Sequence, residues 1–538
     1  MLTVHKGVRH VRRAAAVATV CVLLALLAGC GGGRPAGAAP GPDGGSFSVG
    51  VPSWYVAHLT PAKAGKSSVA DALWTPLTQI DDSGKVVNAV ADSMRSSDHR
   101  HWSISLKPHW TFHNGEPVTA QSFADAWNAA AYGPNAMPYG YLLAPVQGYA
   151  DLNPLKGKPH RNTLSGVHVT GRLTFEVTLS KPLSDFPYVV ASTVFAPLPK
   201  AAFADLTAYD RQPIGNGPYE VAAPGLRPGA QQLTLKRFDR YAGTKGGAAR
   251  IVVKTYQDDA TAYTSFQAGA VDLALAGGNN LAQASRTRPG QVTTATTGAV
   301  VYLGFPLWDQ RFKDPRVRRA FSLAVNRKAI TRSLLQRLGT PAHGIAPDTV
   351  AGGGKQTCAA CSYDPDRARA LLADAGGWHG HLTLATQQDP LYRTVLEAIV
   401  NQLRTNLGIT DITLKTQPAD QLYPNLAAHK LDGPFLLYLG AAYPTLYAPA
   451  EQLFSATSAT NTTGYRDPAF TRLLDRAAGA PTAARSTALA RQAERTALDT
   501  LPLAPLYHPV SGAVHAEELH GVRLDYLGDV RLPGITVH

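Results

Sequence analysis

Residues 102–130 read WSISLKPHWTFHNGEPVTAQSFADAWNAA and combine two strand patterns, a turn and a helix start. Alternating large apolar and polar residues predict two half-buried strands, one at 102–106 and one at 110–112, around a turn at Lys107-Pro108. Thr119 is a suitable N-cap for a following helix. The apolar residues of that helix recur at i, i+3, i+4 and i+7, which predicts one buried face; they are Phe123, Ala126, Trp127 and Ala130.

Residues 110–123 resemble a signature of the large solute-binding proteins of peptide-type ABC importers, W-x-F-x-[ND]-G-x-P-[VL]-[TS]-A-x-x-F. Four further segments match motifs of that family in the family's order. They are IGNGPY at 214–219, DPRVRRA at 314–320, YRDPAF at 465–470 and PLY at 505–507. Because the five segments span nearly the whole chain after its N-terminal region, the sequence resembles extracellular solute-binding proteins of family 5, which bind peptides, oligopeptides or nickel.

The resemblance implies an α/β, two-lobed type II periplasmic-binding-protein fold with three domains, of the large cluster C type, and a two-strand hinge. A chain of this length exceeds what one hydrophobic core supports, which also favours at least two lobes. The expected division is a signal peptide at 1–29, a tether at 30–45, domain I in three parts at 46–90, 188–300 and 505–538, domain II at 91–187, and domain III at 301–504.

The N-terminus has the pattern of a lipoprotein signal. Four basic residues precede an apolar run at 14–28, and Leu27-Ala28-Gly29 leads into Cys30. The run is shorter than the roughly 20 apolar residues that span a bilayer, so cleavage before Cys30 is favoured over a retained anchor. An ordinary signal peptide with an incidental Cys30 is the alternative. We expect lipid on Cys30 to hold the protein at the outer face of the cytoplasmic membrane, with the Gly-, Pro- and Ala-rich segment 31–45 as a tether.

The chain has a net charge of +13, and loss of the four basic residues in the signal leaves +9. Only 17% of residues are charged. The densest basic cluster is Arg316, Arg318 and Arg319, on a helix expected to be capped by Asp314, and we interpret it as a solvated face. Nucleic-acid binding requires a basic stripe interleaved with aromatic residues, so we expect no nucleic-acid partner.

Two cysteines remain outside the signal region and its lipid-acceptor position, Cys358 and Cys361. In an exported protein, Cys-Ala-Ala-Cys favours a small loop disulfide over redox catalysis. A zinc site would need two more ligands, and His343 is poorly spaced for that role. We therefore expect a disulfide and no metal or cofactor.

The region between the two crossing strands of the hinge, placed near 299–305 and 503–507, has an α/β pattern. Helices are predicted from Pro315, at 365–375 and at 391–407, and strands at 382–385 and 412–415. Gly408 follows the longest helix, where a C-cap is expected. The strand-helix-strand order predicts a βαβ unit and a partly parallel sheet.

Enzyme motifs are incomplete in this sequence. Gly65-Lys66-Ser67 resembles the end of a phosphate-binding loop, but Thr60 stands where the first glycine is required. No G-x-S-x-G elbow occurs, and His515 is not followed by the glutamate of a zincin helix. We therefore expect a binding protein without catalytic residues.

The resemblance places candidate ligand contacts in loops on both lobes and on one crossing strand. In such a site, mostly apolar walls and a few polar groups grip a solute while the lobes close. The candidates are Ser53, Trp54, Tyr55, Tyr139, Tyr141, Tyr302, Gln387, Gln388, Gly440, Ala442, Tyr443, Thr445 and Tyr447.

The 438–447 loop departs from the family pattern. Peptide binders place an aspartate there, within W-x-x-D-Y-x-x-P, to pair with a peptide's terminal ammonium. Here alanine occupies that position, Thr445 stands where a second acid often occurs, and no carboxylate lies between Asp432 and Glu451. A buried ammonium opposite neutral groups would be strongly disfavoured, so this loop does not predict recognition of a free N-terminus.

The favoured hypothesis is a monomeric, lipid-anchored binding protein that passes a peptide or peptide-like solute to an ABC permease. A sensor that reuses the fold to report a signalling peptide is the second hypothesis, and a neighbouring permease gene would discriminate between the two. A secreted hydrolase is the third, which turnover assays would expose.

Overall fold

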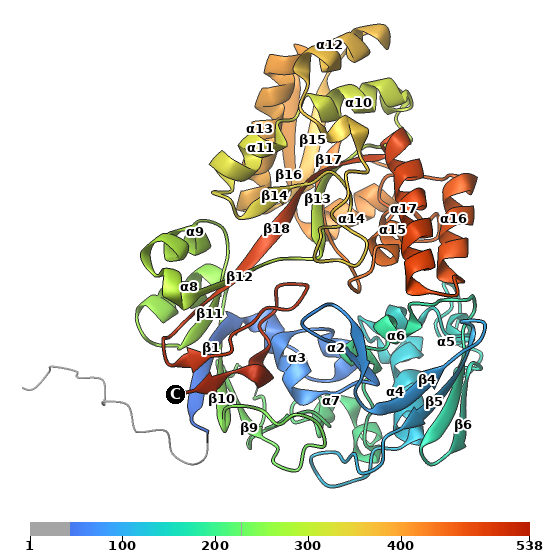
Figure 1. Cartoon of the computed structure of the whole chain (residues 1–538), viewed down its shortest axis with the longest axis vertical. Helices are drawn as coiled ribbons and strands as arrows, with labels where there is room; N and C mark the ends of the chain where they lie inside the picture. Colours follow the sequence, from blue (N-terminus) through green and yellow to red (C-terminus); the bar gives the residue numbers. More distant parts are fainter. Residues whose placement is uncertain (1–43, 228) are drawn as a thin grey trace, which may run out of the picture. The chain divides into compact units, whose positions relative to one another are not determined.

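In a computed structural model, residues 44–227 and 229–538 are described, so the predicted signal peptide and Cys30 lie outside the described residues. Twelve strands form the largest sheet (Figure 1). Ten lie in the order β16 (Ile412–Gln417), β15 (Leu382–Gln387), β17 (Phe435–Gly440), β13 (Ala299–Gly304), β18 (Leu503–His515), β11 (Leu273–Ala276), β1 (Ser46–Pro52), β10 (Arg250–Tyr256), β9 (Gln232–Arg237) and β8 (Tyr219–Val221). Two more, β12 (Val292–Thr296) and β14 (Gly339–Pro341), pair with β18.

Strand β18 is shared by the two halves of this sheet. Its first residues pair with β13, and its last residues pair with β11 and β12, all antiparallel. Figure 1 shows β18 running from the half that contains β15 and β17 to the half that contains β1 and β11. The two segments predicted to cross between lobes are therefore neighbouring strands, β13 and β18.

The predicted βαβ unit is present, and both of its strands extend two residues beyond the predicted ends. Strand β15 is parallel to both β16 and β17. Helix α13 (Pro390–Leu407) connects β15 to β16; the Asp389 side chain accepts two N–H bonds at its start, and Gly408 ends it in the left-handed conformation. Helix α14 (Ala419–Ala427) leads from β16 to β17.

We call the half of the molecule that contains β1 and β11 the first half, and the half that contains β15 and β17 the second half. The first half repeats this parallel arrangement. Strand β1 is parallel to β10 on one side and β11 on the other. Helix α8 (Asp259–Gln267) connects β10 to β11, and α9 (Gly278–Thr287) follows β11.

The signature segment supplies one strand and one helix. Strand β5 (His101–Leu106) lies within a four-stranded sheet ordered β4 (Ala91–Arg95), β5, β7 (Thr174–Thr178), β6 (Val167–Gly171). Helix α4 (Ala120–Ala131) starts at a capping box formed by Thr119 and Ser122. Its predicted apolar face is buried, and Trp127 donates to the Phe195 carbonyl at 2.9 Å.

The prediction of a second strand at 110–112 is wrong. Trp110 and Phe112 are buried, but this segment forms only a single bridge between Thr111 and Pro117. His109 has a φ of 71°, which turns the chain out of an extended path, and the Val118 N–H returns to the Trp110 carbonyl at 2.9 Å. Alternation here reflects a tight loop that inserts two aromatic rings into the core.

Two large hydrophobic cores divide the described chain. The first includes residues from Phe47 to Leu275 together with Ala513 to Ile535, and the second runs from Val300 to Tyr507. A third, small cluster surrounds α8 and α9. The domain limits given above remain predictions, although the chain clearly passes between two cores at β13 and β18.

The interpretation of the Arg316, Arg318 and Arg319 cluster as a solvated face is wrong for Arg318. Helix α10 (Pro315–Leu323) begins at Asp314 as predicted, but Arg318 points inward and is buried. Its guanidinium donates to the carbonyls of Phe312, Lys313, Thr500 and Leu501. A buried arginine can thus be stabilised by carbonyl groups at helix ends, which lack hydrogen-bond partners within their own helices.

Four further helices of the second half contribute to its core. They are α12 (Pro365–Asp374), α15 (Tyr447–Phe454), α16 (Pro468–Ala478) and α17 (Ala483–Thr500). Just before α12, a disulfide joins Cys358 and Cys361, whose Cα atoms are 5.4 Å apart. Within 44–227 and 229–538, the structure contains no helix of the length and apolar character needed to cross a membrane.

Candidate functional site

The carboxyl ends of the parallel strands in the second half form one edge of the sheet. Strands β15, β16 and β17 end at Gln387, Gln417 and Gly440. Because β15 lies between β16 and β17, the chain leaves β15 toward one side and returns on the other, which creates a topological switch point. Such points are where open α/β sheets bind ligands. The candidates Gln387, Gln388 and Gly440 all lie at this edge.

The corresponding edge of the first half follows β1. The short helix η1 (Ser53–Val56) begins directly after β1 ends at Pro52, so Ser53, Trp54 and Tyr55 lie at the carboxyl edge. The Trp54 and Tyr55 rings are 4.1 Å apart between centroids. Trp54 is 64% exposed whereas Tyr55 is buried, so the exposed Trp54 ring packs on the buried Tyr55 ring.

A loop near the C-terminus contacts both edges. We call residues Asp525–Asp529 the C-terminal loop. The Tyr55 hydroxyl donates to Asp529 Oδ1 at 2.6 Å, and the Tyr526 hydroxyl donates to the Ala442 carbonyl at 2.8 Å. The first bond joins the loop to the edge after β1, and the second joins it to the segment after β17. The two edges are therefore brought to one place in the molecule.

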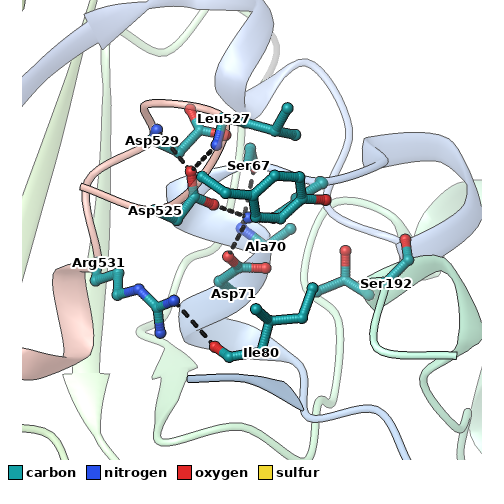
Figure 2. Close-up of polar contacts among 12 residues, drawn as sticks. Ser67, Ala70, Asp71, Ile80, Ser192, Asp525, Leu527, Asp529 and Arg531 are labelled. Atoms are coloured by element: carbon teal, nitrogen blue, oxygen red, sulfur yellow. Dashed lines mark hydrogen bonds and ion pairs between the residues drawn. The ribbon is translucent and has the colours of Figure 1, made fainter. Parts of the chain in front are cut away.

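Lys66 forms ion pairs that connect the C-terminal loop to the rest of the protein. Its ammonium pairs with Asp71 at 2.8 Å and with Asp525, and it lies 6.0 Å from the centre of the Tyr526 ring. Figure 2 shows Asp525 and Asp71 pointing toward the same spot from the C-terminal loop and from α3 (Ser68–Leu73). Asp525 also accepts the N–H groups of Leu527 and Asp529 at 2.8 and 3.0 Å.

The charges in this cluster do not balance. Burial opposes ionisation of Lys66, but the surrounding carboxylates hold its pKa well above its usual value. Burial likewise opposes ionisation of Asp525, yet Lys66 and the loop N–H groups keep the pKa of Asp525 low. Among the described side chains no cation forms an ion pair with Asp529, and burial, opposed by the charge of Lys66, raises the pKa of Asp529 to about 6. One ammonium thus serves three carboxylates, and Asp529 is the one left without a paired charge.

Tyr438 of β17 extends this polar cluster toward the second half. Burial, followed by the charges of Asp529 and Asp525, raises the pKa of the Tyr438 hydroxyl to about 12. The residue is nevertheless 40% exposed. Its hydroxyl therefore remains protonated and can donate to or accept from a polar ligand near the unpaired carboxylate.

The last three candidates of the loop after β17 face the first half of the chain. The Thr445 hydroxyl donates to Asp185 Oδ2 at 2.6 Å, and the Tyr443 ring stacks on Tyr188 with centroids 6.2 Å apart. Burial raises the pKa of Asp185, while the Thr445 bond and nearby His99 lower it. Tyr447 packs against both large cores. These side chains contact protein rather than an open surface.

The other candidates are scattered. Tyr302 is buried in β13, where its hydroxyl lies 3.2 Å from Thr462 Oγ1, so its ring belongs to the second core. Tyr139 and Tyr141 are exposed at 38% and 59%. The Tyr139 N–H donates to the Ala62 carbonyl at 3.1 Å, which places Tyr139 beside the segment that leads to Lys66.

Sequence reasoning missed Lys66, Asp525 and Asp529. In the sequence Lys66 stands out only as part of an incomplete phosphate loop, and Asp525 lies 459 residues further along the chain. The pattern Asp525-Tyr526-Leu527-Gly528-Asp529, with two acids around a turn glycine, is the one signal that could have indicated a tight acidic loop.

The site provides aromatic and polar groups that can hold a ligand. Throughout the described ranges 44–227 and 229–538, no group of three or more His, Cys, Asp or Glu side chains could hold a metal ion. Aromatic rings, tyrosine hydroxyls, loop carbonyls and one unpaired carboxylate are the groups that the two edges provide. This combination suits a polar molecule that carries a positive charge.

The chain is similar to known solute-binding proteins. The family described as bacterial extracellular solute-binding proteins, family 5 Middle, matches residues 85–464. The periplasmic murein peptide-binding protein MppA of Escherichia coli (strain K12) is 25% identical over 491 residues, which cover 88% of this chain and 90% of MppA. The probable deoxycholate-binding periplasmic protein YgiS of the same strain is 25% identical over 470 residues, covering 84% and 85%.

The fold is also similar to solved structures. The unliganded open form of MppA superimposes with a TM-score of 0.77 at 22% identity, and the match covers 91% of this chain and 97% of MppA. The predicted two-lobed α/β fold of the periplasmic binding proteins is thereby confirmed.

Proposed function

Because the chain belongs to family 5 of the bacterial extracellular solute-binding proteins, we propose that it captures a peptide or peptide-like solute for an ABC permease. The solute is held between the carboxyl edge after β1 and the carboxyl edge after β15 and β17. The observation that carries this proposal is the C-terminal loop, which contacts both edges through Tyr55 and Ala442. A ligand at that loop can touch both halves at once, and such a ligand favours the closed arrangement by its extra contacts.

We also propose that Asp529 pairs with an ammonium group of the solute. The loop after β17 has no carboxylate between Asp432 and Glu451, so it offers no partner for a peptide N-terminus. Asp529 is partly buried, and within the part of the chain that the structure describes it forms no ion pair with a cation. A ligand ammonium placed there would replace lost hydration by a charge-assisted hydrogen bond. The carboxylate is thus supplied by the half of the molecule that contains β1 instead of by the half that contains β17.

The protein acts outside the cytoplasm, as the family description states. We propose in addition that lipid on Cys30 anchors it to the outer face of the membrane and that residues 31–45 form the tether. Mass spectrometry of the protein from membranes would test this. A mature N-terminus at a diacylated Cys30 is expected, whereas an unmodified Cys30 would contradict the anchor.

Native mass spectrometry of the purified mature protein tests the proposed solute. We expect a bound species that is lost on denaturation and whose fragments contain a free amine and amide bonds. Because YgiS is named for deoxycholate binding, an apolar anion such as a bile acid is the sharpest alternative. A bound steroid acid, or failure of any tri- to pentapeptide to raise the melting temperature, would contradict a peptide ligand.

A further inference from the structure

A second direct contact between the two cores joins residues 184–188 of the first half to residues 443–447 of the second. The Thr445 hydroxyl donates to Asp185 Oδ2, and the Tyr188 and Tyr443 rings stack beside that bond. The Ser184 N–H donates to the Ala478 carbonyl at 2.7 Å at the edge of the same face. We call the Thr445–Asp185 pair the latch.

The latch joins residues that belong to different cores. Asp185 precedes Phe186, which is buried in the first core, and Thr445 precedes Leu446, which is buried in the second. They are 260 residues apart in the chain, and Asp185 and Thr445 are only 8% and 7% exposed. Any movement that separates the two cores at this face must break the bond and expose both side chains to water.

The chemistry of the pair makes its loss costly while the cores stay together. Among the described side chains, the Thr445 hydroxyl is the one that donates a hydrogen bond to the buried Asp185 carboxyl. A buried carboxyl without its donor is strongly disfavoured, whereas the same carboxyl in water is fully hydrated. Removing the hydroxyl therefore penalises the arrangement in which the two cores touch at this face, called the closed arrangement below, and leaves an arrangement with the cores apart almost unaffected.

We propose that Thr445 and Asp185 are positioning residues that stabilise the closed arrangement and thereby set solute affinity without contacting the solute. This inference rests on the proposed capture of a solute between the two halves. Position 445, where peptide binders of the family often carry an acid, is used here to hold the two halves together. The apparent dissociation constant of a solute rises in proportion as the closed population falls.

The primary test is small-angle X-ray scattering of the ligand-stripped mature protein. Thr445→Val keeps the shape of the side chain but removes the donor, and we expect a larger radius of gyration than that of the wild type. Thr445→Ser restores a hydroxyl and should restore the wild-type value. Thr463→Val is the matched control, because Thr463 is also buried and donates to a side chain, Asn461 at 3.2 Å, but only within the second half.

Equal radii for the wild type and Thr445→Val would overturn the latch, and so would equal expansion in Thr463→Val. If Thr445→Val fails to fold by circular dichroism, Asp185→Asn takes its place, since an amide oxygen still accepts the hydroxyl but as a neutral, weaker partner. A smaller expansion in Asp185→Asn is then expected, and none would overturn the proposal.

A second measurement separates the latch from the proposed function. Titration with a pool of tri- to pentapeptides should give a Kd about 10-fold weaker in Thr445→Val than in the wild type, as expected for loss of a hydrogen bond to a charged group. Expansion in scattering with no peptide binding in any variant would support the latch and contradict the peptide proposal. Wild-type affinity in Thr445→Val would contradict the latch alone.

Discussion

Lys66 is the residue on which the arrangement of the C-terminal loop depends. It is the ammonium between Asp71 and Asp525, and its side chain is 20% exposed while that of Asp525 is 4% exposed. Lys66→Met would leave the buried Asp525 charge without a partner. We expect the free energy of unfolding to fall by about 3 kcal/mol, which urea denaturation can measure.

Lys63→Met is the matched control for that substitution. Lys63 lies three positions earlier, in α2 (Pro61–Ala64), and is partly exposed. A change of less than about 0.5 kcal/mol is expected there. Equal losses in the two variants would show that the segment, and not the ion pair, is sensitive to substitution.

Asp529 predicts a pH-dependent affinity for cationic solutes. Its pKa is raised by burial to about 6, so in the free protein the carboxyl is mostly protonated at pH 5 and mostly ionised at pH 7. Pairing with an ammonium requires the ionised form. Affinity for a peptide with a free N-terminus should therefore rise about tenfold between pH 5 and pH 7 in calorimetric titrations.

Asp529→Asn should flatten that pH profile and weaken binding at pH 7, while the N-acetylated form of the same peptide should bind weakly at both pH values. If Asp529→Asn binds the free and acetylated peptides as the wild type does, the ammonium is recognised elsewhere.

The separate parts of the site were predictable from local sequence, but their grouping was not. Trp54 and Tyr55 follow one strand and Gly440 ends another, so a general rule about strand ends places them at sheet edges. Tyr55 and Asp529 are 474 residues apart, and no local pattern relates them. Thr445 remains a predicted ligand contact, and the bond of its hydroxyl to Asp185, 260 residues away, is one that no local pattern indicates.

At the scale of elements, the turn before β8 depends on a close backbone approach. Gly217 donates its N–H to the Leu73 carbonyl at 2.9 Å, and a Cβ at Gly217 would lie 2.4 Å from the Leu73 carbonyl carbon. Gly217→Ala must therefore push α3 away from β8. We expect a loss of about 3 kcal/mol in the free energy of unfolding. Gly290→Ala, where no atom lies within 4 Å of the added Cβ, should be close to neutral in the same assay.

Elements with strong local signals were predicted well. The caps at Thr119 and Asp314 and the glycine at 408 mark helix ends in the structure as they do in the sequence. The segment at 110–112 failed because apolar alternation reports burial, and a loop can bury alternate residues as a strand does. The prediction that Arg318 is exposed was wrong because its carbonyl partners at 500–501 are far away in the chain.

At the scale of the whole molecule, two cores are connected by neighbouring strands and meet again at the C-terminal loop and at the latch. Length and family resemblance predicted the division into lobes. They could not predict which side chains hold the halves together, because those contacts depend on tertiary packing between residues hundreds of positions apart.

Hydrogen exchange of the ligand-stripped protein, measured with and without a saturating pool of tri- to pentapeptides, tests most directly whether a solute is held between the two carboxyl edges. We expect slower exchange on peptide addition both at 53–56 and at 440–447, with the C-terminal loop protected alongside them. Protection at only one of the two edges, or unchanged exchange at both, would contradict capture between them.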